Sequence, residues 1–205
     1  MLALKEKILH NASALMGQFG ISTVTMDDIA KDCHISKRTL YEQIPDKRTL
    51  VWQCMLHRHN QHEIEAKTLV YESTDTLDAL LHIYKYMRNG MSNASSVFFK
   101  DLHRIYPDLE KKYREIHQEQ SKFFANFLLK GVDEGVFLRN LNFPLATKAF
   151  LAQSSTILQE FATTADPEEM LRMVDVAFII FLRGIATRRG IEIIDSYLKE
   201  NNVTL

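Results

Sequence analysis

The sequence predicts an all-α protein, and three observations support that fold class. Only seven Gly and four Pro interrupt 205 residues that are otherwise rich in helix formers. Apolar residues recur at spacings of three and four, and no convincing run of alternating apolar and polar residues lies between hairpin turns. Hydrophobic residues make up 46% and charged residues 25%, as in ordinary globular proteins, and no apolar stretch is long enough to span a membrane.

Helical periodicity continues along the whole chain. The first predicted helix covers residues 3–18, and a long helix from about residue 47 to 71 would connect the N-terminal region to the remainder. Further helices are predicted at residues 76–91, 94–104, 107–131, 144–162 and 167–189. The first helix should turn its apolar side chains inward, namely Leu4, Ile8, Leu9, Ala12, Leu15, Met16 and Phe19.

Residues 25–47 read TMDDIAKDCHISKRTLYEQIPDK and predict two short helices joined by a turn. Thr25 followed by Asp28 is a capping pattern that begins the first of these helices. Ser36 is a suitable N-cap for the second helix, Lys37–Gln43, which Pro45 ends because proline lacks an amide proton. Two helices with a three-residue turn between them form a helix-turn-helix.

The second of these helices holds the candidate DNA-reading side chains. Lys37, Arg38 and Thr39 occupy its N-terminal turn, which is the part that reaches base edges in the major groove. Arg38 could donate two hydrogen bonds to O6 and N7 of a guanine. A plain solvated helix face is the alternative, and it is disfavoured because the caps, the turn and the proline stop agree. Further contacts, mostly to phosphates, are predicted for Thr25, Ser36, Tyr41, Gln43 and Lys47.

This segment resembles the DNA-binding domain of the TetR family of bacterial transcriptional regulators. The resemblance covers residues 5–50 and is carried by Phe19-Gly20, Thr25, Ile29-Ala30, Ser36, Tyr41, Lys47 and Leu50. It implies a DNA-binding domain at residues 1–48 and a helical domain for effector binding and dimerisation at residues 49–205. Two departures are Cys33-His34, where the family usually has Ala-Gly, and Gln43-Ile44, where it often has His-Phe or Tyr-Phe.

Positive charge is concentrated in the helix-turn-helix segment and is not a property of the whole chain. The formal net charge is -1, yet residues 31–48 hold five Lys and Arg against three Asp and Glu. Affinity for DNA should therefore come from two such surfaces in a dimer. The two cysteines, Cys33 and Cys54, have no metal-binding spacing, and the N-terminus is too charged for a signal peptide. These features favour a reducing cytoplasm.

The last two predicted helices carry broad apolar stripes that could be either core or a self-association surface. The resemblance implies that they form a four-helix bundle with a two-fold mate, so that the operator is near-palindromic. On that basis the dimer interface is predicted to include Phe150, Ile157, Phe161, Val174, Phe178, Phe181 and Ile185.

Residues 80–130 are rich in aromatic side chains and would suit an apolar pocket with a few polar groups. The resemblance implies a small effector here, and the candidates are Phe98, His103, Tyr113 and Phe127. The alternative, which stays open, is that these rings fill an ordinary core.

Other chemistry finds little support in the sequence. On a helix His59 and His62 would share a face and His57 would point away, so no metal site is predicted and no cofactor is expected. No recognisable catalytic motif is present. We therefore predict a homodimeric, ligand-responsive transcriptional repressor. The alternatives are a helical ligand- or partner-binding protein that has lost DNA binding and, less favoured, an enzyme built on the helical body.

Overall fold

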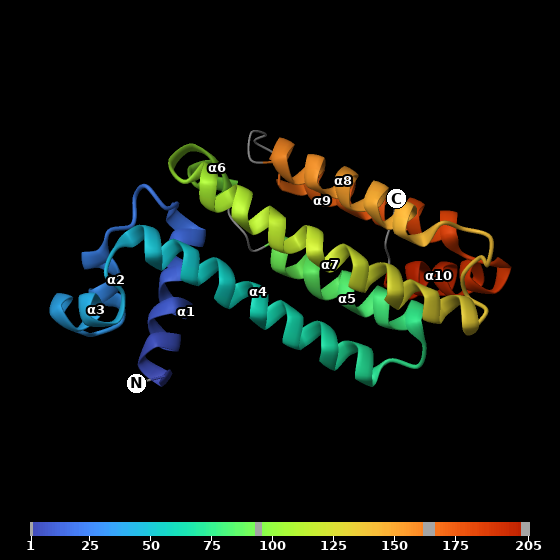
Figure 1. Cartoon of the computed structure of the whole chain (residues 1–205), viewed down its shortest axis with the longest axis horizontal. Helices are drawn as coiled ribbons and strands as arrows, with labels where there is room; N and C mark the ends of the chain where they lie inside the picture. Colours follow the sequence, from blue (N-terminus) through green and yellow to red (C-terminus); the bar gives the residue numbers. More distant parts are fainter. Residues whose placement is uncertain (1, 93–95, 162–166, 202–205) are drawn as a thin grey trace. The chain divides into compact units, whose positions relative to one another are not determined.

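The computed structural model describes residues 2–92, 96–161 and 167–201. These residues form ten α-helices and no β-strand, apart from one isolated bridge between Phe137 and Ala186, which confirms the all-α fold class (Figure 1). None of these helices is long and apolar enough to cross a membrane. The helices are α1 (Leu2–Phe19), α2 (Met26–Asp32), α3 (Lys37–Gln43), α4 (Lys47–Glu72), α5 (Thr76–Ser92), α6 (Ser96–Ile105), α7 (Pro107–Asp133), α8 (Phe143–Phe161), α9 (Pro167–Ile185) and α10 (Arg188–Glu200).

The chain forms two compact units. The first comprises Met1–Glu65 with Asn93–Arg114, and the second comprises Ala66–Ser92 with Glu115–Leu205. Consequently α1, α2, α3 and α6 belong to the first unit, α5, α8, α9 and α10 belong to the second, and α4 and α7 contribute residues to both. The functional division predicted at residue 48 stays a prediction.

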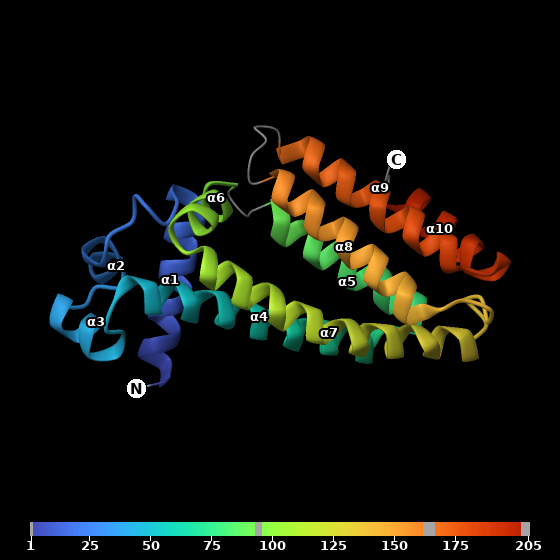
Figure 2. The same cartoon turned by 45° about the horizontal axis from the view of Figure 1, so that its top comes forward.

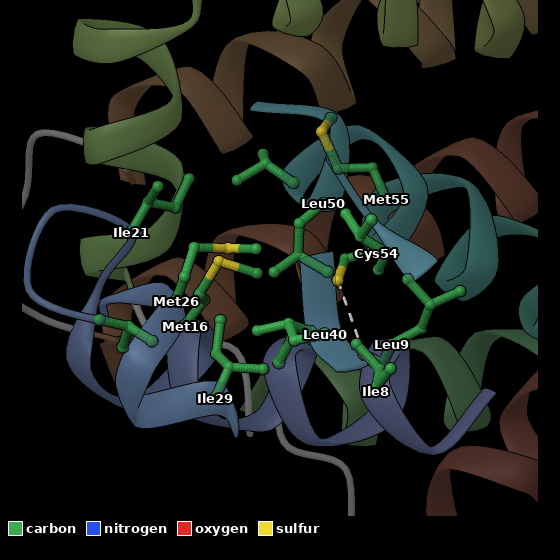
Figure 3. Packing of buried hydrophobic residues seen from close by; sticks show 14 of the residues in the cluster. Ile8, Leu9, Met16, Ile21, Met26, Ile29, Leu40, Leu50, Cys54 and Met55 are labelled. Atoms are coloured by element: carbon green, nitrogen blue, oxygen red, sulfur yellow. Dashed lines mark hydrogen bonds between the residues drawn. The ribbon is translucent and has the colours of Figure 1, made fainter. Parts of the chain in front are cut away.

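The first unit has its own apolar core, which joins α1, α2, α3 and the start of α4 (Figure 3). Ile8, Met16, Ile29, Leu40 and Leu50 are all fully buried there. Short helices such as α2 and α3 are marginal on their own, so this shared core is what holds them in place.

One side chain of α1 departs from the predicted inward face. Phe19 is 49% exposed, whereas Ile8, Ala12 and Met16 are fully buried. Phe19 is the last residue of α1, and Gly20 after it has a φ of 86°, so the chain leaves the helical path at this point. The left-handed conformation of Gly20 ends the helix.

The second unit has a separate core in which aromatic side chains are prominent. Phe137 and Phe143 are its largest fully buried side chains, and Tyr84 stacks on Phe178 with ring centroids 4.2 Å apart. Helices α8 and α9 lie side by side and hold much of this core (Figure 2).

The end of the chain differs from the predicted single helix at residues 167–189. Helix α9 ends at Ile185, and α10 begins at Arg188. Thr187 separates them because its side chain accepts a hydrogen bond from the amide of Gly190, which is the geometry of an N-cap. The amide of Thr187 also donates to the carbonyl of Val136 at 2.9 Å, so a distant segment supports the break.

Candidate nucleic-acid interface

The first helix of the helix-turn-helix begins with the predicted cap. Thr25 accepts a hydrogen bond from the amide of Asp28 at 3.2 Å, and the Asp28 carboxylate accepts from the amide of Thr25 at 2.9 Å. This reciprocal pair is a capping box. Hydrogen bonds from the Thr25 side chain and backbone lower the pKa of Asp28.

The turn between α2 and α3 has a left-handed residue at the position where the family usually has glycine. His34 has a φ of 54°. Its amide donates to the carbonyl of Lys31 at 2.9 Å, and the next amide, of Ile35, donates to Ala30 at 3.0 Å. From α1, Lys7 donates to the carbonyl of Cys33 at 3.0 Å, so the end of α2 is also tied down from outside the motif.

Helix α3 is oriented by its buried side and exposes its cations. Leu40 and, directly after the helix, Ile44 are fully buried, and the Ser36 hydroxyl caps α3 by accepting from the amide of Thr39 at 3.0 Å. This orientation leaves the Arg38 side chain 90% exposed and Tyr41 48% exposed. The N-terminal turn of α3 is therefore free of the core and accessible to a long ligand such as a duplex.

Polar side chains of this turn have partners within the protein. Lys37 forms an ion pair with Asp27 of α2, and Nε of Arg38 donates to Oε1 of Glu42 at 2.9 Å. Binding to DNA must therefore either keep or replace these contacts.

The start of α4 adds a second polar edge. The Asp46 carboxylate accepts from the amide of Thr49 at 2.7 Å and acts as the N-cap of this helix. Lys47 follows and is half-buried. Burial lowers the pKa of Lys47, whereas the carboxylates of Asp101 and Asp28 raise it.

A buried carboxylate that the sequence did not indicate ties α6 to the segment between α1 and α2. Asp101 is 5% exposed and accepts two hydrogen bonds from Ser22, from its amide and its hydroxyl, each at 2.7 Å. Arg104 donates to the same carboxylate at 2.9 Å. Burial raises the pKa of Asp101, but the hydrogen bonds from Ser22 and the charge of Arg104 outweigh it, and the pKa is lowered. No local pattern could have found a pair so far apart in sequence.

The predicted DNA-contacting residues all lie in the first compact unit, between the cap of α2 and the first residue of α4. Thr25, Ser36, Lys37, Arg38 and Tyr41 are exposed, and Thr39, Gln43 and Lys47 are half-buried. Their contacts with DNA stay a prediction.

The four predicted pocket residues do not come together in one packing cluster. Phe98 and Tyr113 pack against the core of the first unit, and Phe127 is buried in the core of the second. The His103 side chain is 74% exposed, and its Nδ1 lies 2.9 Å from Oε2 of Glu110. That these four residues line an effector site stays a prediction.

The histidines of α4 have separate environments. His59 is buried and meets the Tyr113 ring edge-on, with centroids 6.0 Å apart. Burial lowers the pKa of His62, as do Arg58 and His59. In the described part of the chain, no three His, Cys, Asp or Glu side chains gather in a way that could hold a metal ion.

The predicted dimer residues lie mainly on the inner faces of α8 and α9. Ile157, Phe178 and Ile185 are buried within the protomer, and Phe150, Val174 and Phe181 are half-buried. The side chain of Phe161 lies outside the described residues. On the described part of these helices, the large apolar residues that are exposed, and that the predicted set omits, are Leu145, Met173, Val176 and Ile180.

Comparisons with known proteins agree with this geometry. Residues 8–54 match the family model described as bacterial regulatory proteins, tetR family. An HTH-type transcriptional regulator of Staphylococcus aureus (strain bovine RF122 / ET3-1) is 26% identical over 150 residues, which cover 65% of this chain and 80% of that protein.

Solved structures show the same fold. A TetR family regulator from Agrobacterium tumefaciens superposes with a TM-score of 0.69 at 15% identity, covering 91% of this chain and 99% of that one. Thermus thermophilus FadR in complex with lauroyl-CoA superposes with a TM-score of 0.59 at 16% identity, covering 90% and 96%.

A capped helix-turn-helix with exposed cations on its second helix, followed by a helical second unit, defines a DNA-binding transcriptional regulator. The family model adds that residues 8–54 are those of the tetR family of bacterial regulatory proteins, and the relative from Staphylococcus aureus is an HTH-type transcriptional regulator.

Proposed function

We propose that this protein is a homodimeric repressor that binds a near-palindromic operator and is released from it by a small effector. The observation that carries the proposal is the exposed N-terminal turn of α3, with Lys37 and Arg38 at the start of a helix whose opposite face is locked into a core. One such helix covers only a few base pairs, whereas two related by a dyad read half-sites about 34–36 Å apart.

The test is a mobility-shift titration with double-stranded DNA from the region upstream of the protein's own coding sequence, repeated at several salt concentrations. Affinity should fall steeply as salt rises, because cations condensed on phosphates are released on binding. Arg38→Ala should relax base preference at one position by a factor that corresponds to about 1–3 kcal/mol. Lys47→Ala should weaken all sequences alike and reduce the salt slope by about one. Absence of binding at low salt would refute the proposal.

The outer faces of α8 and α9 support association with a second copy. Met173, Val176 and Ile180 lie on α9 at spacings of three and four and are exposed, and Leu145 on α8 is 63% exposed. Such apolar residues are unfavourable in water and are typical of a subunit interface. A two-fold interface would use the same face of both copies.

The effector is proposed to bind in the second unit rather than in the first. Its core combines many aromatic rings with a buried carboxylate, Asp175, which accepts hydrogen bonds from the Tyr84 hydroxyl and from Nε of Arg88. An apolar site with a few convergent polar groups suits an amphipathic ligand. The similar FadR of Thermus thermophilus was solved with lauroyl-CoA, which has that character. Of the four predicted pocket residues, Phe127 lies in this core.

A further inference from the structure

Glu42 is an acidic residue on the helix that is proposed to enter the groove. It lies one turn after Arg38, and its Oε1 accepts from Nε of Arg38 at 2.9 Å. Both side chains are exposed, at 90% for Arg38 and 56% for Glu42. Arginine has five N–H donors, and this bond uses only the one on Nε. The two terminal nitrogens keep four donors for another partner.

A carboxylate at this place opposes DNA binding because it repels phosphates. We propose that Glu42 is a specificity-determining positioning residue, which holds the Arg38 guanidinium so that its two terminal nitrogens meet O6 and N7 of a guanine. This inference rests on the proposed function. It extends that function from the residue that reads the base to the residue that aims it.

The physical reason is the choice of partners open to an unheld arginine. A free Arg38 can rotate toward a phosphate, which provides affinity for every sequence and discrimination for none. When Glu42 holds Nε, less side-chain freedom is lost on meeting guanine. Exclusion of water from the groove strengthens the pair, since the effective dielectric constant falls.

Asp27 provides a matched control on the same surface. It lies in the first turn of α2 and forms an ion pair with Lys37, whereas the ion pair of Arg38 is with Glu42. Asp27→Asn and Glu42→Gln each remove one negative charge and keep the size of the side chain. Both should therefore raise affinity for random DNA, and only Glu42→Gln releases Arg38.

The experiment first selects preferred sequences from a random double-stranded DNA pool with the wild-type protein. Affinities are then measured at one salt concentration for the selected duplex, for duplexes in which each guanine is replaced in turn, and for random DNA. We expect Glu42→Gln to lose roughly three- to tenfold of the discrimination at one guanine, and Asp27→Asn to keep it. In an Arg38→Ala background, Glu42→Gln should cause no further loss.

Three results would overturn the inference. Equal discrimination in the two charge-removing variants would show that Glu42 does not position Arg38. Loss of discrimination that persists in the Arg38→Ala background would mean that Glu42 reads a base itself, for which the amino group of cytosine is the natural donor. Failure of the wild type to select any sequence would remove the proposed function, and this inference with it.

Discussion

His34 has a left-handed backbone, with a φ of 54°, between the two helices of the DNA-binding motif. Side chains with a Cβ occupy this region at a cost of about 1–2 kcal/mol, and glycine occupies it at none. The amide bonds from His34 to Lys31 and from Ile35 to Ala30 hold the conformation. The turn geometry is thus set by the surrounding hydrogen bonds, and the replacement of the usual glycine by histidine leaves it intact.

At the same scale, Asp101 should make stability depend on pH. Its folded pKa is lowered, so its contribution is complete above the unfolded value of about 3.9 and is lost as pH falls through the folded value. Asp101→Asn should lower the free energy of unfolding at neutral pH by about 1–3 kcal/mol and weaken the pH dependence below pH 4. Urea unfolding followed by circular dichroism between about pH 2 and 7 measures both.

Asp108 is the control for this prediction. Its carboxylate forms an ion pair with Arg48, which is 60 residues away in the sequence. The Arg48 side chain is 50% exposed and the Asp108 side chain 59%. Solvent screens such a pair, so Asp108→Asn should change stability little. An equal loss in the two variants would contradict the importance that we assign to the buried bonds of Ser22.

Among the helices, α10 shows how a distant segment decides where an element ends. The carbonyl of Val136 accepts from the amide of Thr187, and the amide of Leu138 donates to the carbonyl of Ile185. These bonds satisfy backbone groups that a continuous helix would have used. The break lets α10 bury Ile194 in the core of the second unit.

Two glycines of the second unit should respond to the same substitution with opposite sign. A Cβ at Gly190 would collide with the carbonyl oxygen of Val136, which is backbone and cannot move aside cheaply. Gly190→Ala should therefore cost about 1–3 kcal/mol. A Cβ at Gly184, in α9, meets nothing within 4 Å, so Gly184→Ala should stabilise by up to about 1 kcal/mol through helix propensity. Thermal unfolding of both variants measures the two changes in stability. A loss of stability in Gly184→Ala as well as in Gly190→Ala would contradict the prediction.

For the whole molecule, the apolar side chains of α9 divide into a buried set and an exposed set. Phe178 and Ile185 face the protomer's own core, whereas Val176 and Ile180 are exposed. A homodimer that buries the second set would leave the first set in place. Under the proposed function, the operator is bound tightly only when two copies act together, so association and DNA affinity are coupled.

Ile180→Glu should disrupt this association. Burying an unpaired carboxylate is costly, so the dimer dissociation constant should rise by at least about tenfold, with a parallel loss of operator affinity. Ile64→Glu is the control, since Ile64 is a similarly exposed isoleucine of the first unit, at 58% against 64% for Ile180. Sedimentation equilibrium measures the dimer constant, and an unchanged constant in Ile180→Glu would exclude this face.

Features that depend on neighbouring residues could be predicted from the sequence, and features that depend on distant residues could not. Thr25, Ser36 and Pro45 predicted the helix-turn-helix because caps and stops act within four residues of themselves. An apolar stripe on a helix does not indicate what packs against it. The sequence of α9 therefore could not show which of its apolar residues lie in the core of the chain and which are available to a second copy. The four pocket candidates were chosen from composition, which carries no information about which aromatic rings share a core.

The sequence by itself determined the fold class, the helix-turn-helix and the cations at the start of α3, since helical periodicity, capping and proline are written in short stretches of chain. Only the tertiary structure decided that Asp101 holds Ser22, that Thr187 ends α9 and that Ile180 is exposed. Each of these depends on groups that are distant in sequence and meet after folding, because burial and hydrogen bonding depend on distance in space.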